Sequence, residues 1–76
     1  MTGRDEFVSQ LRETLEWTGD FSASTVLAGH EKWDSVGRLA ALVLIDEQLG
    51  LAVSADALAS ATSVEDVLAL VREGLS

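Results

Sequence analysis

Apolar residues recur at intervals of three and four along most of this chain, a spacing that places them on one face of an α-helix. The first such stretch predicts a helix over residues 3–16, with Thr2 as its cap and acidic residues in its first turn. Its inward face carries Phe7, Val8, Leu11 and Leu15.

A long polar connection follows, from Trp17 to Asp34. Such a length is unusual between helices of a compact domain. We expect its apolar residues to pin it onto the helices, with a short helical turn near residues 24–27. These residues are Trp17, Phe21, Val26 and Leu27.

The pattern predicts a second helix from Ser35 to Leu49, capped by Asp34 and ended by Gly50. This helix has two apolar stripes, and one stripe must face the core. The first stripe, which we expect in the core, holds Ala41, Leu42, Ile45 and Leu49. The second stripe holds Val36, Leu39, Ala40 and Val43, and it is either buried as well or left open for partners.

Two more helices complete the pattern. A short one fits residues 55–59, with Ser54 as its cap. The last begins at the capping-box sequence of residues 62–65 and runs to about Gly74. We therefore predict an all-α fold over residues 1–76, a single-domain four-helix bundle with three longer helices, one short helix and a long first loop.

Composition narrows the possible functions. Thirteen acidic residues against five basic ones give a net charge of −8, which disfavours binding to nucleic acid or to an anionic membrane surface. The same charge favours a partner with a basic docking patch. The chain has no cysteine and one histidine, so we expect no metal site.

The sequence also bears on where in the cell the protein is expected. The longest apolar run is Leu39–Ile45, far short of the roughly 20 residues that cross a bilayer. The first ten residues lack the basic start and apolar core of a signal peptide. We therefore expect a soluble, cytoplasmic protein.

Ser35 is the candidate functional residue. Because Asp34 already serves as the cap, Ser35 stands one position inside the helix and its hydroxyl is free to point outward. It lies beside backbone N–H groups and the positive end of the helix dipole, a suitable place for a phosphate.

Asp34-Ser35-Val36, followed by an apolar helix and a glycine-ended turn, resembles the Asp-Ser-Leu attachment motif of acyl carrier proteins. The likeness covers nearly the whole chain. It includes Thr25-Val26-Leu27, the Trp33-Asp34-Ser35 approach and the stretch from Thr62 to Val67.

The resemblance implies that a phosphopantetheinyl transferase moves 4'-phosphopantetheine from coenzyme A onto Ser35, with Asp34 beside it. The arm then holds an acyl group as a thioester and presents it to acyl-loading and acyl-processing enzymes. On this basis we expect the chain to be no enzyme and to have no catalytic residue, and a monomer fits a protein that must visit several enzymes. Carried over from the family, the contacts with those enzymes are the apolar Val36, Leu39, Ala40 and Val43 and the acidic Asp34, Asp46, Glu47 and Asp56.

One stretch departs from the family. Carriers of fatty-acid synthesis continue the motif with acidic residues, where this chain has Gly37, Arg38 and Ala40. A positive charge at Arg38 mismatches a partner that reads acid there, so we predict that Arg38 contributes to partner choice. This departure favours a stand-alone carrier of a dedicated pathway, such as polyketide, hybrid-peptide or polysaccharide-linked biosynthesis.

Two alternatives stay open. A peptidyl or aminoacyl carrier, including a D-alanyl carrier, would share the fold, the serine and the arm. A helical interaction module would need only the apolar stripe and the acid. A serine hydrolase built on Ser35 and His30 is disfavoured because the Gly-x-Ser-x-Gly turn is missing, and we expect His30 to be a solvated loop residue and Trp33 a packing anchor.

Overall fold

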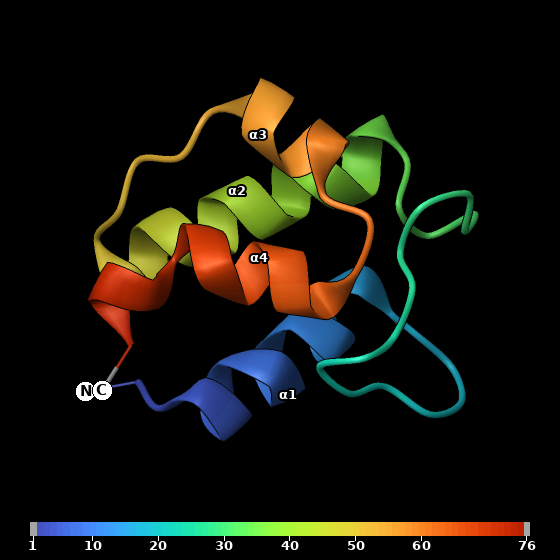
Figure 1. Cartoon of the computed structure of the whole chain (residues 1–76), viewed down its shortest axis with the longest axis horizontal. Helices are drawn as coiled ribbons and strands as arrows, with labels where there is room; N and C mark the ends of the chain where they lie inside the picture. Colours follow the sequence, from blue (N-terminus) through green and yellow to red (C-terminus); the bar gives the residue numbers. More distant parts are fainter. Residues whose placement is uncertain (1, 76) are drawn as a thin grey trace.

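The computed structural model describes residues 2–75, which form four α-helices and one 3-10 helix (Figure 1). In chain order these are α1 (Arg4–Leu15), α2 (Ser35–Leu49), α3 (Ala55–Ser60), α4 (Val64–Leu70) and η1 (Arg72–Gly74). Within residues 2–75 the backbone forms no strand, only an isolated antiparallel bridge between Val26 and Ser63. The all-α prediction is therefore confirmed.

The hydrophobic core draws on all four α-helices and on the long loop. In Figure 1, α4 runs between α1 and α2, while the short α3 lies beside the first turns of α2. The large side chains with essentially no exposed surface are Phe7, Leu11, Leu27, Ile45, Leu58, Val64, Val67 and Val71. Because the chain has no cysteine and hence no disulfide, the packing of these apolar side chains supplies most of the stabilisation.

The inward face of α1 is as predicted, but its cap is not. Phe7, Leu11 and Leu15 are buried, and Val8 packs half-buried against them. The N-cap is Gly3, without a side-chain hydrogen bond, so the prediction that Thr2 caps this helix is wrong. The Phe7 N–H already donates to the Gly3 carbonyl at 2.9 Å, which places the cap one residue beyond Thr2 and the first helical residue at Arg4.

The long loop crosses the bundle and is pinned by three of the four expected residues. Trp17 and Leu27 are buried and Phe21 is half-buried, but Val26 is 63% exposed. The predicted helical turn at 24–27 is not found at that place: a hydrogen-bonded turn lies earlier, with the Thr25 N–H donating to the Ser22 carbonyl at 3.0 Å, and Val26 forms the extended bridge to Ser63. Successive side chains in extended backbone point to opposite sides, so burial of Leu27 turns Val26 outward.

The start and end of α2 agree with the prediction. Asp34 Oδ1 accepts a hydrogen bond from the Gly37 N–H at 2.8 Å, and Gly50 ends the helix in the left-handed region at a φ of 65°. The side chain of Ser54 likewise caps α3 by accepting from the Ala57 N–H at 3.0 Å.

The start of α4 differs from the prediction by one residue. Ser63 is the cap and Asp66 is the acidic residue of the motif, rather than Thr62 and Glu65. The reason is that the Glu65 N–H donates to the Ala23 carbonyl of the loop, so Glu65 is held by a tertiary contact. The α-helix ends at Leu70, and η1 continues the chain to Gly74.

Candidate functional site

Ser35 is the first residue of α2 and is exposed, at the point where the long loop ends. The cap of this helix is supplied by Asp34, so the helix does not need the Ser35 hydroxyl. Asp34 is exposed as well. The Ser35 side chain is therefore exposed to solvent and is not used as the helix cap.

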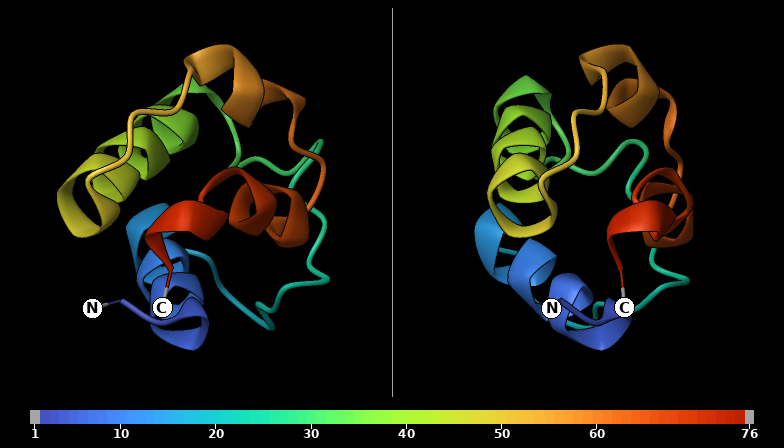
Figure 2. Two further views of the ribbon diagram at one scale, coloured as in Figure 1. Left: turned by 60° about the vertical axis from the view of Figure 1, so that its left-hand side comes forward. Right: turned by 90° about the vertical axis from the view of Figure 1, so that its left-hand side faces the viewer.

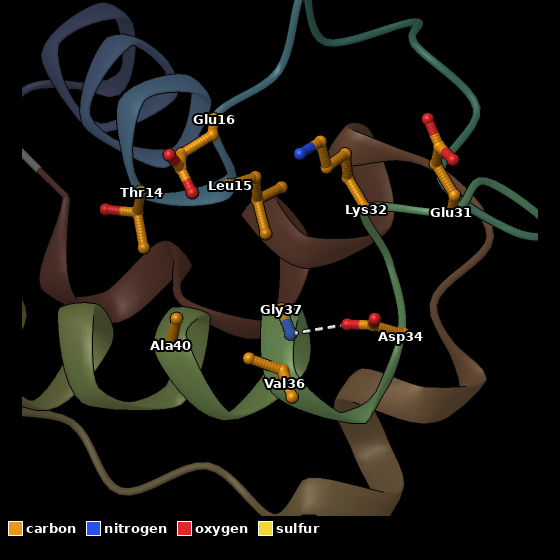
Figure 3. A pocket seen from close by; sticks show the side chains of 9 residues that line it. All are labelled: Thr14, Leu15, Glu16, Glu31, Lys32, Asp34, Val36, Gly37 and Ala40. Carbon is orange, nitrogen blue, oxygen red and sulfur yellow. Dashed lines mark hydrogen bonds between the residues drawn. The ribbon is translucent and has the colours of Figure 1, made fainter.

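Gly37 lets the loop pack closely on the first turn of α2. A Cβ at this position would overlap the Lys32 carbonyl oxygen and lie 3.3 Å from Leu15 Cδ2 (Figure 3). In the sequence, Gly37 is notable only as a departure from the acidic residues of fatty-acid synthesis carriers. The structure gives a reason for glycine at this position, which is contact with the chain's own backbone.

Trp33 and Arg38 fix the end of the loop. Trp33 is buried, as expected for a packing anchor. The half-buried Arg38 donates from Nη1 to the Trp33 carbonyl at 2.9 Å. Sequence reasoning missed this hydrogen bond, because an arginine on an otherwise apolar helix gives no indication of its acceptor.

His30 belongs to the packed part of the loop, so the prediction of a solvated residue is wrong. Its ring is half-buried and stacks on Trp17, with the ring centroids 3.8 Å apart. Its Nδ1 accepts from the Lys32 N–H at 3.0 Å. His30 is therefore a structural residue of the loop.

An apolar groove of about 420 Å³ adjoins Ser35, between α2 and α3, and we call it the α2–α3 groove. Besides Ser35 it is lined by Arg38, Leu39, Leu42, Ala55, Asp56 and Ala59. The small side chains of α3 leave space, and Leu39 and Leu42 supply an apolar wall. The groove places a hydroxyl, a cation and a carboxylate around an apolar floor.

A second hollow lies on the opposite flank of α2, against the end of α1, and we call it the α1–α2 hollow. Figure 3 shows one part of this hollow. Thr14 and Glu16, at the end of α1, lie on one side, Val36 and Ala40 of α2 lie on the other, and Lys32 comes from the loop. Its apolar continuation passes Leu39 and Val43 toward Glu47.

The two stripes of α2 differ in exposure. Ala41 and Ile45 of the first stripe have no exposed surface, and Leu42 and Leu49 pack half-buried against the core, so this stripe is confirmed as the core face. In the second stripe Val36 is 75% exposed, Leu39 62% and Val43 45%, while Ala40 is half-buried. We call these four residues the apolar ridge.

The predicted acidic contacts are all exposed, but they do not form one cluster. Asp34 precedes Ser35, and Asp56 reaches the α2–α3 groove from α3. Asp46 and Glu47 lie eleven and twelve residues beyond Ser35, about 17 Å along the helix axis. Acidic side chains therefore lie at both ends of the apolar ridge.

The charged side chains around Ser35 are exposed or half-buried. Within residues 2–75 no group of three or more histidine or acidic side chains could hold a metal ion. The same part of the chain contains no helix that is both long and apolar enough to span a membrane.

Protein-family models, curated proteins and solved structures were compared with this chain, and none of them matches it. The function is therefore inferred from the residues and their geometry.

Proposed function

We propose that this chain is an acyl carrier protein that bears 4'-phosphopantetheine on Ser35. The observation that supports this best is an exposed serine at the first position of a fifteen-residue helix whose cap is supplied by the preceding aspartate. This arrangement keeps the hydroxyl accessible and leaves the helix intact when the hydroxyl is esterified.

The start of α2 suits a phosphodiester. Within residues 2–75, no backbone carbonyl of the loop accepts from the Ser35 or Val36 N–H groups, and free N–H donors at a helix start favour a nearby phosphate. The helix dipole adds a favourable interaction with negative charge, worth about 0.3–1 kcal/mol at an exposed helix start. The α2–α3 groove offers the apolar part of the arm a neighbouring surface.

The apolar ridge and its acidic ends support docking to the transferase and to acyl-loading and acyl-processing enzymes. Isolated exposed apolar residues are ordinary, but Val36, Leu39 and Val43 form a continuous stripe on one helix beside Ser35. The net charge of −8 selects partners with basic patches. A cytoplasmic monomer fits a carrier that visits several enzymes in turn.

Arg38 distinguishes this proposal from a housekeeping fatty-acid carrier, and we place the chain in a dedicated biosynthetic pathway. An aminoacyl or peptidyl carrier, including a D-alanyl carrier, has the same requirements at Ser35. A non-covalent interaction module is the other alternative, and the specific observation in its favour is that the apolar ridge is already exposed in the unmodified chain.

The test is intact-mass analysis after incubation with coenzyme A, magnesium and a phosphopantetheinyl transferase of broad specificity. We expect the native chain to gain the mass of one phosphopantetheine group and Ser35→Ala to gain none. An interaction module would keep its binding partners in Ser35→Ala and would gain no mass in either form. No mass gain with several competent transferases contradicts the carrier proposal.

A further inference from the structure

The guanidinium of Arg38 is held at the start of α2, where Ser35 also lies. Ser35 and Arg38 are three residues apart, which places them on the same face of α2 one turn apart. Side chains of a helix lean toward its N-terminus, so Arg38 extends back past Ser35. Its hydrogen bond to the Trp33 carbonyl, two residues before Ser35, fixes the guanidinium at this level.

Both side chains also line the α2–α3 groove, where Arg38 is the basic residue among the lining groups. The hydrogen bond that holds Arg38 ends on a neutral carbonyl, so this bond does not neutralise the guanidinium, and the acidic side chain that lines the same groove is Asp56. A guanidinium has five N–H donors, and one bond to Trp33 leaves others for further acceptors. Paired N–H donors match the geometry of phosphate oxygens.

We propose that Arg38 binds the phosphate group esterified at Ser35, an inference that rests on the proposed carrier function. Arg38 is then part of the binding site for the arm, in addition to its predicted effect on partner choice. A consequence is that modification masks the positive charge of Arg38, so the apo and holo forms present different charges at the start of α2.

Lys32 provides a matched control. It is also basic and near the start of α2, but it lines the α1–α2 hollow on the opposite flank of the helix. Arg38→Gln and Lys32→Gln therefore remove the same charge from opposite sides of Ser35. Any effect of net charge alone is common to both variants.

The first measurement is the difference in thermal midpoint between holo and apo forms of each chain. We expect this holo-minus-apo difference to be more positive in the native chain than in Arg38→Gln by about 1–5 °C at low salt. Loss of the Trp33 hydrogen bond affects apo and holo Arg38→Gln alike, so it cancels. Lys32→Gln should keep the native difference, and 1 M salt should reduce it in the native chain.

The second measurement does not depend on the transferase. A chain made by chemical synthesis with phosphoserine at position 35 is titrated by ³¹P NMR. An adjacent guanidinium favours the dianion, so we expect the second phosphate pKa to be lower in the native background than in Arg38→Gln by about 0.2–0.7 units. If Arg38→Gln fails to fold, the Arg38 guanidinium resonances of the native sequence provide the readout, since they should shift on phosphorylation while those of Arg12 do not.

The outcomes separate the two proposals. Modification of Ser35 with equal holo-minus-apo differences in the native chain and Arg38→Gln overturns the role of Arg38 and leaves the carrier function standing. Absence of modification, with an Arg38-dependent phosphoserine pKa, contradicts the carrier function while supporting phosphate binding by Arg38. A phosphoserine pKa that is the same with and without Arg38, or unmoved Arg38 resonances, overturns the inference directly.

Discussion

The starts of α2 and α4 use the same kinds of residue for different purposes. At α4 the serine is itself the cap, with Ser63 Oγ accepting from the Asp66 N–H at 3.4 Å. The first two N–H groups of that helix donate to loop carbonyls, Val64 to Thr25 at 3.0 Å and Glu65 to Ala23 at 2.8 Å. The start of α4 is therefore closed by its own chain.

At α2 the aspartate is the cap and the serine follows it. Asp34 accepts from Gly37, Ser35 is exposed, and the loop approaches through the Lys32 carbonyl rather than through hydrogen bonds to the first N–H groups. The comparison shows that exchanging the order of cap and serine makes a hydroxyl available without loss of the cap. Capping therefore leaves the serine hydroxyl unused at the start of α2 and occupies it at the start of α4.

Gly37→Ala should have the largest effect on this comparison. Helix propensity alone predicts that replacing a helical glycine by alanine stabilises a protein, by up to about 1 kcal/mol. The contact with the Lys32 carbonyl reverses the sign, and we expect a loss of about 1–3 kcal/mol in the free energy of unfolding, measured in urea. Gly3→Ala is the control for steric overlap, because no atom lies within 4 Å of a Cβ at that position, and its loss should be smaller and limited to the poorer N-cap of α1. An unchanged or increased stability of Gly37→Ala would show that the loop does not pack on α2 as described.

Removing each cap should have the next largest effect. Asp34→Ala and Ser63→Ala each delete the side-chain oxygen that accepts a helix N–H, and each should lower the free energy of unfolding by about 0.5–2 kcal/mol. Asp34→Asn keeps an acceptor and should lose much less. If Asp34→Ala proved neutral, Ser35 would have to be capable of capping in its place, and the distinction between the two helix starts would fail.

Acid should weaken the start of α4 by a smaller amount. The hydrogen bond from the Thr62 hydroxyl to Asp66 Oδ2, at 2.6 Å, is the main reason why the pKa of Asp66 lies below its ordinary value of 3.8. The unfolded chain thus takes up this proton at a higher pH than the folded chain does. The stabilisation is present above the ordinary pKa and is lost as the pH falls through the lower pKa of the folded state.

Thr62→Val should therefore reduce the loss of thermal stability between neutral pH and about pH 3, whereas Thr62→Ser, which keeps the hydroxyl, should behave like the native chain. The readout is the thermal midpoint across this pH range. Equal acid sensitivity of Thr62→Val and the native chain would contradict the role of this hydrogen bond.

Much of the fold could be predicted from local pattern. The limits of α2 follow from Asp34 and Gly50, whose preferences at helix ends are strong and local. The errors at α4 and in the long loop arose where distant parts of the chain decide the structure. The cap of α4 depends on hydrogen bonds from the loop, and the exposure of Val26 depends on its bridge to Ser63.

In the candidate site, too, the features set by neighbouring residues could be predicted and those set by distant residues could not. The exposure of Ser35 could be predicted because the cap is its immediate neighbour in sequence. The carbonyl that Arg38 binds and the contact that requires Gly37 could not, because both depend on how the loop folds back onto α2. The half-burial of His30 likewise depends on stacking against Trp17, thirteen residues earlier in the chain.

The most direct test of the proposed carrier function is to locate the modified hydroxyl. After treatment with coenzyme A and a phosphopantetheinyl transferase, the chain is digested and its serine-containing peptides are fragmented in a mass spectrometer. We expect one phosphopantetheine group on Ser35 and none on the capping serines Ser54 and Ser63. A group on either of those serines, or a chain that stays unmodified throughout, would contradict it.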